Sequence, residues 1–475
     1  NRDRNGAVSS PLRVVAPSCG NPPRFTSRLI LPDNLVKDLP CLGKVFVCIL
    51  EFQMVAKAQS TLTFHGGAGA VTGANFLLTI APVTPDGRAI RLLVDCGLYQ
   101  GGKVFEDQNR DPFPYDPATI DYLLVTHAHL DHVGRIPWLV RQGFRGIIYS
   151  TAPTKEIVAL ILEDSLGVMG KEARGAGKPL LYGPADITAA LVCWRTIEYR
   201  VPLNIGAGRD ATITLHDAGH ILGSAMFEIV RGERRLLFTG DLGNSPSPLL
   251  HEIEIVKGVN YLVMESVYGD REHEPSAARR DRLEDVIEET MKKNGVLLIP
   301  AFSIERTQEL LYELEHMTAE GRIPSAPVYL DSPLAIRVTE IYKRFQSFFN
   351  QNVSDPDHSR DGVFNFSNLH KTLTTEESRA IADTPGRKII FAGSGMSNGG
   401  RIIHHEKHYL ANPSTALLLI GYQAAGSLGR LLEEGAKEVT ILGARVPVRA
   451  KVVALPGYSA HCDGPGLLEF VHQLS

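Results

Sequence analysis

Short apolar runs separated by glycine-rich turns begin the patterned part of the chain. These runs are rich in β-branched and aromatic residues, which is typical of strands. They occupy residues 61–64, 76–80 and 90–94. Apolar positions at helical spacing follow over residues 153–169, and strand-like runs return within residues 195–215 and at 236–239. The first half of the chain is therefore expected to combine short strands with a long helix.

The second half of the chain alternates apolar strands with helical patterns. A charged amphipathic helix is expected at residues 276–293, an apolar strand at 295–300 and a helix at 304–317. Further apolar strands, each followed by a helical pattern, are expected at residues 328–330, 388–392 and 416–420. Repeated βα units of this kind predict a parallel sheet.

The first 59 residues lack this regularity. They are rich in Pro, Ser, Arg and Gly, and they contain three of the six cysteines, Cys19, Cys41 and Cys48. Their basic, apolar and small residues do not follow the order of a signal peptide. We interpret residues 1–59 as a disordered extension or as a non-native one, in which sequence ahead of a true start at Met54 has been translated. An arm that binds a partner is the alternative.

Composition and charge narrow the class of protein. Of the 475 residues, 44% are hydrophobic and 21% charged, which supports packed cores and excludes a disordered, collagen-like or coiled-coil chain. The net charge of −4 excludes a generally basic nucleic-acid coat, so a polyanionic partner needs a local positive site. No apolar run approaches the roughly 18 residues that span a bilayer. Scattered cysteines fit a reducing compartment, so a soluble cytoplasmic protein is expected.

Clustered metal-ligand side chains follow an apolar strand that begins at Tyr122. His127, His129, Asp131 and His132 fall within six positions, and a loop gains no packing from three neighbouring histidines. Imidazole nitrogen and carboxylate oxygen together suit Zn²⁺, Mn²⁺ or Fe²⁺. One ion cannot use all four side chains from so short a loop, which favours two ions.

Three more candidates follow other expected strands. His220 and Asp241 could complete the ligand set, and Asp95 could orient a ligand through a hydrogen bond. Each of them alone would more often be a turn or capping residue. The histidine cluster is what favours metal binding for the whole group.

The order of these residues resembles that of a known family. Asp95, the histidine cluster, His220 and Asp241 resemble, in this order along the chain, the first four motifs of the metallo-β-lactamase superfamily. Glu265, in Glu-Ser-Val-Tyr-Gly, resembles the acidic motif A of the β-CASP nucleases, and His461, in Gly-Tyr-Ser-Ala-His, resembles their histidine motif B. From about residue 61 onward, the chain is similar to bacterial and archaeal RNases related to the nuclease subunit of the cleavage and polyadenylation factor.

The resemblance implies an α/β fold, an αββα metallo-β-lactamase sandwich with an inserted parallel α/β β-CASP domain. The expected domains are residues 61–267 for the first part of the sandwich, 268–454 for the β-CASP domain and 455–475 for the return to the sandwich. The chain has to return because Glu265 and His461 must meet at one site although they lie far apart in sequence.

The resemblance also implies the roles of the site residues. Two divalent ions are expected, one held by His127, His129, His220 and Asp241, the other by Asp131, His132 and Asp241. Zinc is the expected metal and manganese the alternative. Asp95 and Asp241 would support a hydroxide that attacks the substrate, while Glu265 would orient His461 to protonate the leaving oxygen.

One motif of the family is not found. Motif C is a histidine on the second metal that lies farther along than motif B, and the given chain ends at Ser475. His472 lies too early and in a helical context, so we do not assign it. The second ion is therefore expected to bind more weakly, through truncation or under-coordination.

Two loops before expected helices could bind phosphate through backbone amides and helix N-termini. The candidates are Ser303, Arg306, Ser394, Gly395, Ser397 and Arg401. Simple helix caps at Ser303 and Ser397 are the alternative. His404 and His405 are expected on the surface of a helix over residues 401–410. A local phosphate pocket would reconcile the acidic net charge with an RNA substrate.

The expected function is that of a metal-dependent ribonuclease acting on single-stranded RNA. A hydrolase of small esters or thioesters is one alternative, although the βα block between Glu265 and His461 is far larger than a substrate lid. A weakly active RNA-binding relative is another, because one metal ligand is not found. The RNA target, the choice of RNA over DNA, endonuclease or exonuclease action and a homodimer are left open. The family's KH extension is not visible.

Overall fold

The structure is a computed structural model, and it describes residues 47–48, 59–82, 87–100, 107–177, 179–208, 210–353, 363–421 and 423–474. Our interpretation of residues 1–59 therefore falls outside the described residues, apart from residue 59 and a two-residue strand, β1 (Val47–Cys48). This strand pairs antiparallel with β12 (Tyr261–Val263) at the edge of a six-stranded sheet.

Two six-stranded sheets build the first domain. In spatial order, the first sheet consists of β2 (Thr61–Gly66), β3 (Asn75–Ile80), β4 (Ile90–Val94), β5 (Tyr122–Leu124), β6 (Ile147–Ser150) and β7 (Trp194–Thr196). It is antiparallel from β2 to β4 and parallel from β4 to β7. Beyond β1 and β12, the second sheet consists of β11 (Arg234–Phe238), β10 (Ala225–Arg231), β9 (Ala211–Asp217) and β8 (Leu203–Ile205).

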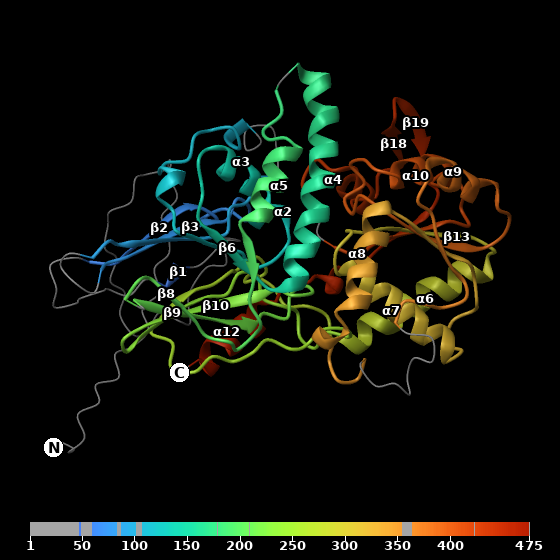
Figure 1. The fold of residues 1–475 in the computed structure, drawn as a ribbon. Coiled ribbons are helices and arrows are strands. Elements are labelled where there is room, and N and C mark those ends of the chain that lie inside the picture. Colours follow the sequence, from blue (N-terminus) through green and yellow to red (C-terminus); the bar gives the residue numbers. More distant parts are fainter. Residues whose placement is uncertain are drawn as a thin grey trace, which may run out of the picture.

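The alternation of side chains along the strands decides the layers, because neighbouring residues face opposite sides of a sheet. Leu92 of β4 belongs to a buried cluster with Phe227 of β10, between the sheets. Its neighbour Leu93 belongs to a cluster with helix residues on the other face. The helices of this region are α2 (Leu130–Val133), α3 (Ile136–Arg141), α4 (Ala152–Ala176) and α5 (Pro184–Val192). On the outer face of the second sheet, Leu237 packs with Phe470 of α12 (Gly464–Gln473). The layers form an αββα sandwich (Figure 1).

A parallel sheet builds the inserted domain. In spatial order, its strands are β15 (Leu369–Lys371), β14 (Val328–Asp331), β16 (Lys388–Ala392), β13 (Val296–Pro300), β17 (Ala416–Leu419) and β20 (Lys451–Ala454). Every neighbouring pair is parallel, because helices connect the strands. The prediction of a parallel sheet from repeated βα units is therefore confirmed.

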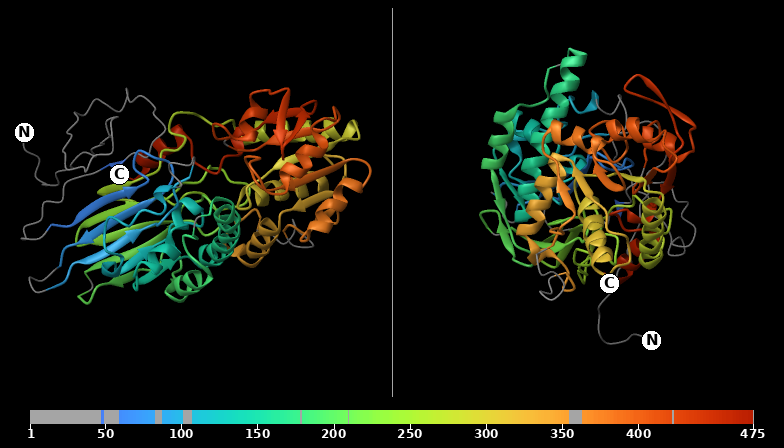
Figure 2. Two further views of the ribbon diagram at one scale, coloured as in Figure 1. Left: turned by 90° about the horizontal axis from the view of Figure 1, so that it is seen from above. Right: turned by 90° about the vertical axis from the view of Figure 1, so that its right-hand side faces the viewer.

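Helices cover both faces of this parallel sheet, as Figure 1 and Figure 2 show. Leu297 packs on the side of α6 (Ser276–Lys292), α7 (Arg306–Ala319) and α8 (Pro333–Arg344). Leu298 packs on the side of α9 (Thr375–Asp383), α10 (Ile402–Tyr409) and α11 (Leu428–Glu433). A hairpin of β18 (Glu438–Ile441) and β19 (Ala444–Pro447) lies beyond them.

Two predicted helix starts need correction. The helix expected from residue 304 begins at Arg306, because Glu305 has a φ of +62° and so precedes the helix as its N-cap. The helix expected from residue 401 begins at Ile402. Short 3₁₀ helices lie at Pro117–Thr119, Gln346–Phe348 and Pro456–Tyr458.

After β20, the chain returns to the sandwich. His461 forms an isolated β-bridge with Gly243, and Asp463 forms one with Tyr268. Helix α12 then lies near the second sheet, close to β10 in Figure 1. The predicted fold class, a sandwich with an inserted parallel α/β domain, is confirmed. The domain boundaries at residues 267 and 454 stay predictions.

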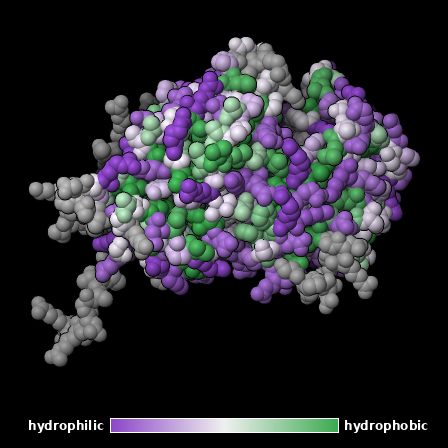
Figure 3. All heavy atoms as spheres, viewed as in Figure 1, coloured by the Kyte–Doolittle hydropathy of each residue, from purple (hydrophilic) through white to green (hydrophobic). Residues whose placement is uncertain are grey.

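In the described part of the chain, no helix is long and apolar enough to cross a bilayer. Figure 3 shows hydrophobic and hydrophilic residues interspersed over the viewed face of both domains.

Candidate active site

The end of β5 and the short helix α2 present the clustered ligands. His129 is the N-cap of α2, and Asp131 and His132 lie within that helix. The segment after β4 packs closely against it, since the backbone N–H of Cys96 donates to the carbonyl of His132 at 2.8 Å. A Cβ at Gly97 would lie 1.5 Å from the carbonyl oxygen of Asp131, so this approach requires glycine.

Four donor atoms from three loops converge on one point. His129 Nδ1 lies 3.0 Å from His127 Nε2 and 3.3 Å from His220 Nε2. Asp241 Oδ2 lies 3.4 Å from His127 Nε2 and 3.7 Å from His220 Nε2. Ligand atoms of a tetrahedral zinc site are about 3.4 Å apart at ordinary Zn–N distances. The spacing of this group therefore fits a zinc-sized cation.

Hydrogen bonds on the far side of the rings aim the free nitrogens inward. Thr126 Oγ1 donates to Asp95 Oδ2 at 2.8 Å, so it accepts from His127 Nδ1 at 3.0 Å. His220 Nδ1 donates to the carbonyl of Ala460 at 3.2 Å. Both imidazoles thus keep an Nε2 lone pair for the site, which is how proteins commonly orient metal-binding histidines.

The electrostatic environment keeps the imidazoles of His127, His129 and His220 neutral. Burial, followed by the neighbouring histidines, lowers the pKa of His127 and of His220 well below the usual value. Burial and the nearby imidazole of His461 lower the pKa of His129 to about 3. A neutral imidazole is the form that binds a metal ion.

A second set of donors lies on the other oxygen of Asp241. His132 Nε2 is 3.4 Å from Asp241 Oδ1 and 3.9 Å from Asp131 Oδ2. His132 Nδ1 donates to Asp95 Oδ2 at 2.8 Å, which turns Nε2 toward Asp241. The two oxygens of Asp241 therefore face two different donor sets, an arrangement in which one carboxylate can bridge two cations.

The charge balance of this second set also favours a cation. Burial lowers the pKa of His132, but the surrounding carboxylates, Asp241 first, outweigh it and raise the pKa to about 10. Burial and the nearby Glu265 raise the pKa of Asp241, against the influence of His132. Several carboxylates in one buried site carry excess negative charge, and a divalent cation would offset that charge.

His461 and Glu265 stand beside the metal ligands as a pair. His461 Nδ1 lies 3.0 Å from Glu265 Oε2 and 3.8 Å from Asp241 Oδ2. Burial lowers the pKa of His461, but Glu265 raises it to about 9. The other oxygen of Glu265 accepts the backbone N–H of Leu242 at 2.5 Å. One carboxylate therefore positions both the histidine and the loop of Asp241.

Arg306, predicted to bind phosphate, has internal partners. Its guanidinium is buried, pairs with Glu309 and donates to the carbonyl of Tyr458. Ser303 precedes α7 but is not its N-cap, which is Glu305. The alternative of a simple cap at Ser303 is therefore wrong.

The glycine-rich loop after β16 contains the other phosphate candidates, Ser394, Gly395, Ser397 and Arg401. Ser397 is buried and its hydroxyl donates to Glu406 at 2.5 Å. It does not cap α10, whose N-cap is Arg401. The alternative of a simple cap at Ser397 is therefore wrong as well. Ser394 Oγ is buried and has no hydrogen-bond partner among the residues that the structure describes.

A buried aspartate that we did not predict holds this loop. Asp331 Oδ1 accepts from Arg401 at 2.6 Å and from Thr372 Oγ1 at 2.6 Å. Its Oδ2 accepts from His405 at 2.7 Å and from Ser378 Oγ at 2.6 Å. His405, expected on the helix surface, is thus buried; His404 is exposed. The sequence feature that could have indicated this role is the position of Asp331 at the carboxyl end of a parallel strand, β14.

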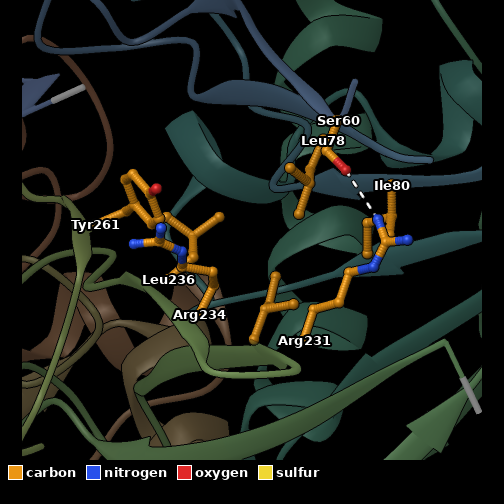
Figure 4. Close-up of a pocket in the computed structure, with 8 residues that line it drawn as sticks. Ser60, Leu78, Ile80, Arg231, Arg234, Leu236 and Tyr261 are labelled. Atoms are coloured by element: carbon orange, nitrogen blue, oxygen red, sulfur yellow. Dashed lines mark hydrogen bonds between the residues drawn. The ribbon is translucent and has the colours of Figure 1, made fainter. Parts of the chain in front are cut away.

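One pocket of the described part of the chain lies at the candidate site, and another lies apart from it. One is bordered by metal-ligand candidates, among them Asp95, His132 and Asp241, together with Glu265. The other, shown in Figure 4, shares no residue with the candidate site. There the guanidinium of Arg231 donates to the hydroxyl of Ser60 at 3.0 Å, beside the apolar side chains of Leu78 and Ile80.

Family models match three parts of the chain. A metallo-beta-lactamase superfamily domain matches residues 84–267, a Beta-Casp domain residues 307–432, and a Zn-dependent metallo-hydrolase RNA specificity domain residues 445–475. The metallo-β-lactamase match implies divalent metal ions, and the His/Asp group described above is the candidate site for them.

Similar proteins cover most of the chain. "Ribonuclease TTHA0252" of Thermus thermophilus is 40% identical over 86% of this chain and 89% of its own length. "Transcription termination factor FttA" is 31% identical in Methanosarcina mazei and 32% in Methanocaldococcus jannaschii, in each case over 87% of this chain and 64% of the relative. A solved protein of unknown function from Enterococcus faecalis V583 is 12% identical, with a TM-score of 0.49 over 88% of this chain and 92% of that one.

This protein is a metal-dependent hydrolase with a metallo-β-lactamase domain. More narrowly, the chain belongs to the β-CASP branch of the metallo-β-lactamase superfamily. The family and the enzyme class expected from the sequence motifs are thereby confirmed.

Proposed function

We propose that this protein is a ribonuclease that hydrolyses phosphodiester bonds in single-stranded RNA. The observation that carries the proposal is the His461–Glu265 pair, with His461 Nδ1 only 3.8 Å from an oxygen of Asp241. The RNA specificity domain matched at residues 445–475 and the relative named a ribonuclease support RNA as the substrate.

Two metal positions would be filled from the chain's own residues. The first would use His127, His129, His220 and Asp241, the second Asp131, His132 and Asp241. When bound, the cations would supply a nucleophilic water and offset the charge of the phosphate. We favour zinc over manganese, because imidazole nitrogens dominate the first donor set.

His461 is the proton donor in this proposal. Glu265 accepts a hydrogen bond from the N–H at Nδ1, so the ring presents its other nitrogen to the substrate. The raised pKa of His461 keeps the ring protonated near neutral pH. A protonated ring can give its proton to the oxygen that leaves when the phosphodiester bond breaks.

A cleavage assay tests the proposal. The full chain would be incubated with a 5′-labelled, unstructured RNA, with and without a chelator, and the bound metals would be measured by mass spectrometry of the holoenzyme. We expect cleavage that the chelator abolishes and added Zn²⁺ or Mn²⁺ restores. Asp241→Asn, purified in parallel, controls for contaminating ribonuclease.

Absence of RNA cleavage by a folded, metal-loaded protein would refute the proposal, and hydrolysis of a thioester instead would favour the small-molecule alternative. The product pattern distinguishes endonuclease from exonuclease action. A matched DNA oligonucleotide tests RNA preference, and light scattering tests the homodimer. A cytoplasmic location stays a prediction.

A further inference from the structure

An exposed aromatic ring lies at the middle of the parallel sheet's carboxyl edge. Phe302 follows β13, which has β16 on one side and β17 on the other. Its relative exposure is 38%, which places it among the exposed large apolar residues. In parallel α/β domains, ligands bind outside the carboxyl ends of the strands. An exposed phenyl ring at this edge is therefore in the position of a ligand contact.

Glycines on both neighbouring loops lie against one edge of the ring and leave part of it exposed. A Cβ at Gly395, after β16, would lie 2.6 Å from Phe302 Cδ2. A Cβ at Gly421, after β17, would lie 3.4 Å from Phe302 Cε2. At these two positions the loops approach the Cδ2–Cε2 edge of the ring, and neither glycine has a side chain that could cover it.

Hydrogen bonds hold the ring's surroundings in place. Gln423 Nε2 donates to the carbonyls of Gly395 at 3.1 Å and Gly421 at 3.2 Å, which ties the two loops together. Thr307 Oγ1 donates to the carbonyl of Phe302 at 2.7 Å, which fixes the turn before α7. A ring held in this way offers a surface that loses little freedom when a ligand binds.

The turn that carries Phe302 borders the candidate active site. Four residues further on, Arg306 donates to the carbonyl of Tyr458, three residues before His461. Besides burial and the neighbouring histidines, the charge of Arg306 contributes to the lowered pKa of His129 and of His220. The turn that carries Phe302 therefore leads directly into the residue that joins the inserted domain to the segment of His461.

We propose that Phe302 is a platform on which one unpaired nucleobase of the RNA stacks, close to the phosphate that is cleaved. The inference rests on the proposed function and adds a feature of the substrate. Every base has a π-face, so such a contact tolerates different sequences. A base inside a duplex has both faces covered by its neighbours, so the platform selects single-stranded RNA.

A double-mutant cycle, in which the phenyl ring of Phe302 and one RNA base are removed separately and together, tests this contact. Each unstructured RNA of the set carries one abasic nucleotide, placed at a different position around the cleavage site. Binding is measured to the chain carrying Asp241→Asn alone and to the chain carrying both Asp241→Asn and Phe302→Ala. Fluorescence anisotropy gives the dissociation constants. We expect one abasic position to weaken binding by about tenfold when Phe302 is present, and to have no further effect in Phe302→Ala.

Control variants separate stacking from general damage. Phe302→Tyr keeps the aromatic ring and should retain both tight binding and the abasic effect. Leu431→Ala removes another exposed apolar side chain of the same domain, 46% exposed, and should leave binding unchanged. Circular dichroism and thermal unfolding would show that Phe302→Ala is folded.

Two results would overturn the platform. The abasic effect could persist undiminished in Phe302→Ala, or no abasic position could matter for the chain that keeps Phe302. If RNA cleavage occurs in the Phe302-containing holoenzyme but either result is found, the platform is wrong and the ribonuclease proposal stands. If the folded holoenzyme neither binds nor cleaves RNA, both are wrong.

Discussion

His461 Nδ1 lies 3.0 Å from Glu265 Oε2, although the two residues are 196 positions apart in the chain. The two residues flank the inserted domain, and both approach Asp241. The backbone on either side is joined as well, since the N–H of Asn244 donates to the carbonyl of Ala460 at 2.9 Å. The candidate site is therefore complete only after the chain has returned from the inserted domain.

Glu265→Gln is expected to move the alkaline limb of the kcat/KM profile to lower pH. Glu265 raises the pKa of His461, so its neutral replacement lets the pKa fall and the proton donor is lost earlier as pH rises. We also expect kcat to fall by about 10- to 100-fold. Gln keeps an oxygen for the N–H of Leu242. An unchanged pH profile with normal metal content would contradict this role of Glu265.

Asp241→Asn is expected to abolish RNA cleavage in a folded protein. Asn keeps the shape of the side chain but loses the charge that two cations would share, so kcat/KM should fall by at least about 10³-fold. Metal content and circular dichroism should be measured with the cleavage rate. Near-normal turnover with unchanged metal content would rule out the two-metal site.

Arg306→Met is expected to destabilise the protein. The substitution leaves the buried Glu309 without its cation and removes the donor to the carbonyl of Tyr458. Breaking a buried pair in this way costs about 3–5 kcal/mol of unfolding free energy, measurable by urea denaturation. Adding Glu309→Gln should recover part of the loss. Unchanged stability with a raised KM for RNA would instead restore Arg306 as a phosphate ligand.

His216→Gln is expected to destabilise the protein more at pH 6 than at pH 9. His216 lies 2.9 Å from both Glu228 and Glu254. Burial lowers the pKa of His216, but the two carboxylates raise it above 6.5 overall. Its stabilising charge is therefore fully present below pH 6.5 and is lost as the pH rises through the raised value.

Glu228 and Glu254 set the lower limit of the pH range in which the charge of His216 stabilises the protein. The pKa of Glu228 is lowered, first by its hydrogen bond with His216; that of Glu254 is raised by burial but lowered overall by Arg200 and His216. Their contribution is present above about pH 4.5 and is lost as the pH falls. Urea unfolding at both pH values checks the prediction, with the exposed His404→Gln as control. An equal loss at both values would contradict it.

Local sequence was sufficient to predict features whose residues lie in one short segment of the chain. His127, His129, Asp131 and His132 need only one loop and one helical turn to gather at the same end of β5. The parallel sheet was likewise readable from apolar strands alternating with helical patterns, because each strand must bury both faces. Neither inference required knowledge of distant contacts.

Local sequence failed where burial depends on distant elements. His405 has the sequence neighbours of a surface helix residue, but Asp331, 74 positions earlier, accepts a hydrogen bond from its ring inside the domain. Arg306 has the position of a phosphate ligand at a helix start, but Glu309 and the carbonyl of Tyr458 occupy its guanidinium. Spacing within one segment carries no information about such partners.

The sequence by itself determined the donor types, their order along the chain and the class of fold, because residue chemistry and hydrophobic periodicity act over short distances. Only the tertiary structure decided which nitrogen of each imidazole faces the site, which charged side chains are already paired, and that Phe302 remains partly exposed. These properties depend on side chains brought together by the packing of separate strands and helices, and periodicity within one element does not encode them.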